Sequence, residues 1–160
     1  MTLLETIEDK VSCLPTPTRF VYSTLEEANA TIFDELLTGQ FPVCLILALD
    51  IEDYSRENGL VKSQAEINAL FLDRVPRETI DKPVSEVENE VIAPMRSLSR
   101  ELINRLDKSD IVEENGIESV VHRSVHEALM DAHLYGNWAV FTIKFSEDLT
   151  TCVHDNQGGS

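Results

Sequence analysis

The segment from Val61 to Leu72 has the two-residue periodicity of a half-buried β-strand. Small or apolar side chains occupy every second position, and the set assigned to the buried face is Val61, Ser63, Ala65, Ile67, Ala69 and Phe71. A helix over residues 60–72 is the alternative, because Ser63 followed by Glu66 fits a capping box and several later residues fit one helical face. The alternation favours the strand, and we expect it to form half of a long hairpin.

An almost continuous apolar segment, Phe41 to Ile51, precedes this strand. Its apolar side chains point to both sides, with Val43, Leu45, Leu47 and Leu49 on one face and Cys44, Ile46 and Ala48 on the other. A strand that is apolar on both sides is usually covered on both sides. We therefore predict a central strand here, followed by a polar turn over residues 53–59.

Three further segments have strand character. The segment Asn137 to Phe145 alternates, with Trp138 on the face opposite the predicted core face. Asn115-Gly116 is a pair typical of hairpin turns, and we expect a strand from Ile117 to His126 after it. Residues 19–23 form a short additional strand candidate.

Helices are predicted at three places. Residues 1–14 have apolar side chains at helical spacing and end at a Pro-Thr-Pro sequence. Thr24 and Ser85 each precede a glutamate by three residues, which indicates capping boxes for helices over residues 24–38 and 85–106. Pro94 lies inside the second of these helices, so we expect a kink or break near Ala93.

Together these elements predict an α+β fold in a single domain over residues 1–145. In this fold an antiparallel sheet of about four to five strands is flanked by helices, in the order of elements seen along the chain. Residues 146–160 are mostly polar and end in Gln-Gly-Gly-Ser, which predicts a C-terminal tail outside the domain.

Charge and cysteine content argue against several classes of protein. The formal net charge of −16 opposes binding to phosphate backbones, since duplex affinity comes largely from Lys and Arg that displace counterions. Cys13, Cys44 and Cys152 are widely spaced and odd in number, which fits neither a disulfide framework nor a zinc site and indicates a reducing compartment. The longest apolar run, residues 41–49, is far shorter than the roughly 20 residues of a bilayer-spanning helix, so we expect no membrane insertion.

Residues that carry chemistry in other proteins lack the necessary context in this chain. His122 and His126 lie four apart, but this spacing converges on zinc only on a helix, and the segment is predicted as a strand. His133 fits a turn or interface residue better than a general base. The carboxylates around the first turn lack the glycine-containing calcium-loop pattern; they are Asp50, Glu52, Asp53 and Glu57. We therefore predict no catalytic residues, no metal, no cofactor and no enzymatic activity.

The order of elements resembles that of the small neck and tail-completion subunits of tailed bacteriophages, including tail terminators and ring proteins stacked beneath the portal. The resemblance is carried by the apolar strand 41–49, the strand end Ala69 to Asp73, the helical Ala93-Pro94-Met95-Arg96 and the closing strand Trp138 to Phe145. It implies an antiparallel sheet flanked by helices and a homo-oligomeric ring. It also implies a structural virion role in the neck or tail. There the ring would join capsid and portal to tail, or cap the tail, while double-stranded DNA passes through without specific binding.

The resemblance further implies assembly in the host cytoplasm, with portal, neck and tail proteins as partners. Ring contacts need exposed apolar or aromatic anchors, and our candidates for the subunit interface are Met95, Arg96 and Trp138. Trp138 fits the core of the monomer equally well. The acidic candidates for a channel surface that repels DNA, all predicted in turns, are Asp53, Glu57, Glu113 and Glu114. An alternative function is an acidic adaptor or inhibitor that mimics DNA and binds a basic partner, which requires carboxylates gathered on one face.

Overall fold

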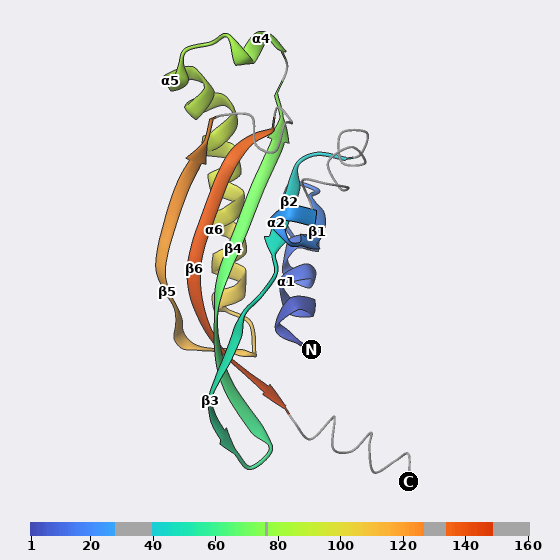
Figure 1. The fold of residues 1–160 in the computed structure, drawn as a ribbon, viewed down its shortest axis with the longest axis vertical. Coiled ribbons are helices and arrows are strands. Elements are labelled where there is room, and N and C mark those ends of the chain that lie inside the picture. The colour runs from blue at the N-terminus through green and yellow to red at the C-terminus, as the bar shows by residue number, and fades with distance from the viewer. Residues whose placement is uncertain (28–39, 76, 127–133, 149–160) are drawn as a thin grey trace.

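The fold is α+β, with a mostly antiparallel six-stranded sheet that carries helices on one face (Figure 1). The computed structural model describes residues 1–27, 40–75, 77–126 and 134–148. The helices are α1 (Leu3–Ser12), α2 (Leu25–Glu27), α4 (Arg77–Ile80), α5 (Val84–Val87) and α6 (Ala93–Asp107). The strands are β1 (Arg19–Ser23), β2 (Val43–Leu47), β3 (Ile51–Glu57), β4 (Leu60–Arg74), β5 (Val112–Val125) and β6 (Leu134–Asp148).

Strand β4 lies in the middle of the sheet and pairs with β2, β3 and β6. The strand order is β1-β2-β4-β6-β5, and β3 pairs with β4 on the same edge as β2. The pair β1 and β2 is parallel, whereas all other pairs are antiparallel. The predicted strand over residues 60–72 is therefore confirmed. Ser63, which suggested a helix cap, is buried and donates a hydrogen bond to Asp53 instead.

The predicted strand from Phe41 to Ile51 is interrupted. Ile46 pairs with Ala69 and Ile51 pairs with Ala65, so the four residues between them on this edge face only three residues of β4. The extra residue divides the edge into β2 and β3, as a β-bulge does. Strand β2 is apolar on both faces as predicted, and its first four residues are buried.

The hairpin between β3 and β4 turns on two residues only. Asn58 and Gly59 both have positive φ, 54° and 78°, which is the signature of a tight hairpin turn. Strand pairing continues up to Glu57 and Leu60. The predicted turn over residues 53–59 is thus too long: Asp53 and Glu57 lie in β3, not in a turn.

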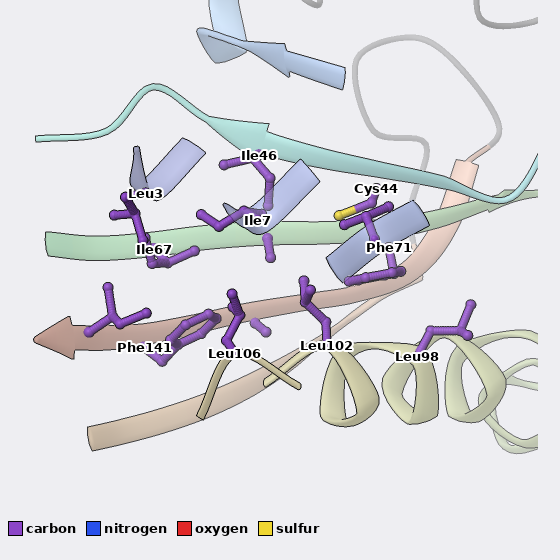
Figure 2. Packing of buried hydrophobic residues seen from close by; sticks show 14 of the residues in the cluster. Leu3, Ile7, Cys44, Ile46, Ile67, Phe71, Leu98, Leu102, Leu106 and Phe141 are labelled. Atoms are coloured by element: carbon purple, nitrogen blue, oxygen red, sulfur yellow. The ribbon is translucent and has the colours of Figure 1, made fainter. Parts of the chain in front are cut away.

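The main core fills the space between the sheet and the helices α1 and α6 (Figure 2). Helix α1 begins with a capping box between Thr2 and Glu5 and buries the apolar stripe that the sequence predicts. Helix α6 lies beside α1 on the same face of the sheet and contributes Leu98, Leu102 and Leu106 to the same core. The sheet contributes the alternate residues of β4 and β6 that the periodicity places on the core face, including Ile67, Phe71 and Phe141.

Helical structure runs from Val84 to Asp107 with one irregular turn. Residues Glu88–Ile92 form a π-helical turn, in which the N–H of Ala93 bonds to the carbonyl of Glu88. This wider turn comes directly before Pro94, which has no N–H to donate. The predicted irregularity near Ala93 therefore takes the form of a π turn. The predicted cap at Ser85 is wrong, because the N-cap is Pro83 and Ser85 lies inside α5.

Strand β5 contains a bulge where the sequence predicts a hairpin turn. Val112 pairs with Phe145 and Ile117 pairs with Ile143, so both sides of Asn115-Gly116 lie against the same strand, β6. Asn115 has a φ of 56°. A Cβ at Gly116 would lie 2.7 Å from two carbonyl oxygens, which explains the glycine there. Glu113 and Glu114 are thus part of a bulged strand.

Candidate functional site

A connected network of polar side chains lies where the π turn and α6 meet β5 and β6. The guanidinium of Arg96 forms an ion pair with Glu88, with 2.9 Å between Nη2 and Oε1. The same Nη2 donates to Ser124 Oγ at 2.7 Å, and Nε donates to Asn137 Oδ1 at 3.1 Å. Arg96 therefore joins all four elements through one planar group.

His122 in β5 and His126, the residue after the end of β5, both belong to this network. The Asn137 amide donates to Ser99 Oγ at 3.1 Å and to His122 Nδ1 at 2.9 Å. His126 Nε2 lies 2.9 Å from Glu88 Oε2. Burial, followed by the charges of Arg100 and Arg96, lowers the pKa of His122, which favours the neutral ring. Within the described residues no group of three or more metal-ligating side chains converges, and His133 lies outside those residues.

This network was not predicted from the sequence, although the sequence contains one signal for it. Asn137 is fully buried on the core face of β6, a face otherwise lined by Ala139 and Phe141. A buried amide needs hydrogen-bond partners. An amide at an apolar position of the strand pattern therefore indicates a polar network on the neighbouring elements.

The structure separates the three residues proposed for a subunit interface. Met95 is only 5% exposed and packs in the main core, so it offers no surface to a neighbouring subunit, and that prediction is corrected. Arg96 is held in the network, with about a fifth of its side chain exposed. Trp138 is partly buried, and its indole N–H donates to Asn68 Oδ1 at 3.0 Å.

Trp138 packs against a second, smaller cluster on the face of the sheet opposite α1 and α6. The buried members of this cluster are Val43, Leu45, Leu70, Leu72 and Leu134. Because Trp138 lies at the margin of the cluster and keeps part of its ring accessible, it contributes to the monomer and still offers surface to a partner.

The acidic residues proposed for a channel surface come from two strands that the structure connects. The phenol of Tyr54 in β3 donates a hydrogen bond to the carboxylate of Glu113 in the bulge of β5. Asp53 accepts hydrogen bonds from Ser63 and Arg56, which lower the pKa of its carboxyl group. Glu57 and Glu114 are exposed.

The carboxylates that suggested a calcium loop point to different sides of β3. Glu52 pairs with Gln64 and Asp53 pairs with Ser63, so the two acids lie on opposite faces of the sheet. Asp50 and Glu52 line a shallow groove of about 330 Å³ together with Glu66, whereas Asp53 is bound to Arg56. The cluster predicted around one turn is therefore split by the pleat of the strand.

A second groove lies between α6 and β5 and has a volume of about 370 Å³. Its hydrogen-bond donors are Arg100 and Asn104 on the helix and Asn115 and His122 on the strand. Its apolar lining comes from Ile103, Ile117 and Val120, and Asp107 is the acidic residue in its wall. We call this feature the α6–β5 groove.

No family model matches the sequence, and no curated protein matches it significantly. Among the described residues no helix is long and apolar enough to cross a membrane.

Proposed function

We propose that this protein is a structural, non-catalytic subunit of a tailed bacteriophage that assembles into a homo-oligomeric ring at the neck or tail end. The ring would join capsid and portal to the tail and let double-stranded DNA pass. It would assemble in the host cytoplasm with portal, neck and tail proteins as partners. The support comes from surfaces that the monomer leaves uncovered.

The observation that carries the proposal is the β3–β4 hairpin, which extends beyond the ends of α1 and α6 (Figure 1). Large apolar side chains of this hairpin are exposed: Ile51 by 48% and Tyr54 by 46% near its base, and Leu60 by 41% at its tip. Exposed large apolar side chains on a projecting element offer contact surface to a partner protein. A projecting arm of this kind suits contact with a neighbouring subunit.

A second uncovered surface is the outer edge of β5. This strand pairs only with β6 in the described sheet, and Val120 and Val121 on it are 41% and 48% exposed. The β3–β4 hairpin and the outer edge of β5 are different surfaces of one chain. A contact between two different surfaces is heterologous, and such contacts generate closed rings when the rotation between subunits closes.

The charge of the arm agrees with passage of DNA. Glu52 and Glu66 are exposed on β3 and β4, and carboxylates facing a channel repel phosphate and limit binding to the passing duplex.

The test is the assembly state of the purified protein, alone and mixed with portal and tail components of a tailed phage. Sedimentation velocity and negative-stain imaging should show closed rings in at least one of these samples. Only monomers in every sample would contradict the proposal.

An acidic adaptor or DNA mimic is the second candidate, and the groove lined by Asp50, Glu52 and Glu66 favours it. A mimic should bind a basic partner with an affinity that falls strongly between low and moderate salt. Ring formation that is insensitive to salt would exclude this candidate.

A further inference from the structure

We infer that the α6–β5 groove is the receptor for the tip of the β3–β4 hairpin from a second copy of this chain. This inference rests on the proposed ring function and specifies the contact that would build the ring.

Charge complementarity is the first argument. Arg100 is exposed in the groove, and no ion pair or hydrogen bond to it occurs among the described residues, although the chain carries a net charge of −16. Arg96 in the turn before is held by Glu88, whereas the side chain of Arg100 is left free for an anionic partner. Asn104 and Asn115 add neutral hydrogen-bond donors beside it.

The shape and chemistry of the hairpin tip are the second argument. Glu57 and Leu60 are paired across the two-residue turn, so their side chains lie next to each other on one face of the hairpin. Both are exposed. The tip therefore presents one carboxylate beside one large apolar side chain.

The groove offers the matching pair. The carboxylate of Glu57 fits the guanidinium of Arg100, and the side chain of Leu60 fits the apolar wall formed by Ile103 and Ile117. The hairpin reverses direction over only two residues, so the turn that carries Glu57 and Leu60 is tight enough to approach a groove between one helix and one strand. Asp107 at the groove wall repels a second carboxylate and so favours one orientation of the tip.

Disulfide trapping tests the contact directly. In a chain with Cys13→Ser and Cys152→Ser, a Glu57→Cys protein is mixed with an Asn104→Cys protein under mild oxidation. The control mixture replaces Asn104→Cys by Glu8→Cys, an exposed position on α1. We expect a disulfide-linked dimer in the first mixture and little in the control, and equal yields would overturn the inference.

Charge reversal tests the energetics. Glu57→Arg and Arg100→Glu should each weaken self-association about tenfold or more, and the two variants mixed together or combined in one chain should restore it. Lys10→Glu, a partly exposed charge on α1 outside the groove and the hairpin, is the control and should leave association unchanged. Thermal unfolding followed by circular dichroism checks that each variant is folded.

The outcomes separate the two proposals. If the parent forms closed rings and both charge-reversal variants keep them, the groove is not the receptor and the ring function stands. If the parent forms no ring with any partner, the ring function fails, and the disulfide yield alone decides whether the tip and the groove meet.

Discussion

The phenol of Tyr54 is hydrogen-bonded to the carboxylate of Glu113, 59 residues further along the chain. Tyr54 lies at the register shift of β3, and Glu113 lies in the bulge of β5, on the far side of β4 and β6 in the strand order. The register shift of β3 and the bulge of β5 are thus in contact. The contact fastens the base of the hairpin to the body of the sheet.

This contact should be visible in the titration of Tyr54. The hydrogen bond to Glu113, partial burial and the negative charge of Glu113 raise the pKa of Tyr54 to about 12. A pKa raised in the folded state means that the stabilisation is complete below the ordinary value of about 10 and is lost as the pH rises through 12.

Ultraviolet difference titration of the parent against Tyr54→Phe isolates this group. Glu113→Gln should move the midpoint down towards the ordinary value, whereas Glu114→Gln, the matched neighbour, should leave it near its parent position. An unchanged midpoint in Glu113→Gln would show that the hydrogen bond is absent in solution.

Replacement of Arg96 by alanine should destabilise the protein by about 1–3 kcal/mol, because Glu88 and the fully buried Asn137 both lose a charged partner. The control is Arg105→Ala, which removes an ion pair with Glu101 on the surface of the same helix and should cost about 0.5 kcal/mol or less. Urea unfolding measures both. Similar costs for the two variants would show that the network around Arg96 adds nothing beyond a surface pair.

Gly136→Ala should be among the most disruptive small changes in the chain. An added Cβ would lie 1.9 Å from the carbonyl oxygen of Phe71, so the backbones of β4 and β6 would have to separate. We expect a loss of about 3 kcal/mol or more in the free energy of unfolding, the upper range for an overpacked site. Ser146→Ala in the same strand is the control and should change stability by less than about 0.5 kcal/mol. A stable, fully folded Gly136→Ala protein would contradict the close approach of the two strands.

Trp138→Ala should weaken assembly more than it weakens folding. The Trp138 side chain is only partly buried. It lies on the sheet face opposite α1 and α6, where a neighbouring subunit has access. Phe141→Leu, a change at a core position of the same strand, should have the reverse order of effects. Sedimentation velocity measures assembly and urea unfolding measures stability. Equal losses of both for Trp138→Ala would assign the residue to the monomer alone.

Periodicity identified the strands of this fold but not their interruptions. The alternation from Val61 to Phe71 outweighed the helical signal of Ser63 with Glu66, because the packing of one face over many residues exceeds the effect of a single cap. The break between β2 and β3 leaves the apolar pattern almost unchanged, so the sequence offers no local sign of it. The parallel pairing of β1 with β2 depends on contacts between distant segments, which periodicity does not report.

Turn signals were less informative than they looked. Asn115-Gly116 and Asn58-Gly59 are the same dipeptide, yet the first forms a bulge within a strand and the second reverses the chain. Both sites need a positive φ at the asparagine, and only the partner strand decides between the two outcomes. The candidate site was missed for the same reason, since Arg96, Ser124 and Asn137 meet only after α6 packs on the sheet.

Strand β4 has a mechanical consequence, because one uninterrupted strand forms both the hairpin and the middle of the core. Its fifteen residues all pair with β6, so a pull on the hairpin tip along the strand axis loads these hydrogen bonds together in shear rather than one after another. The hairpin is therefore anchored along the full length of the sheet. Force applied at its tip is transmitted through β4 to the sheet face against which α1 and α6 pack.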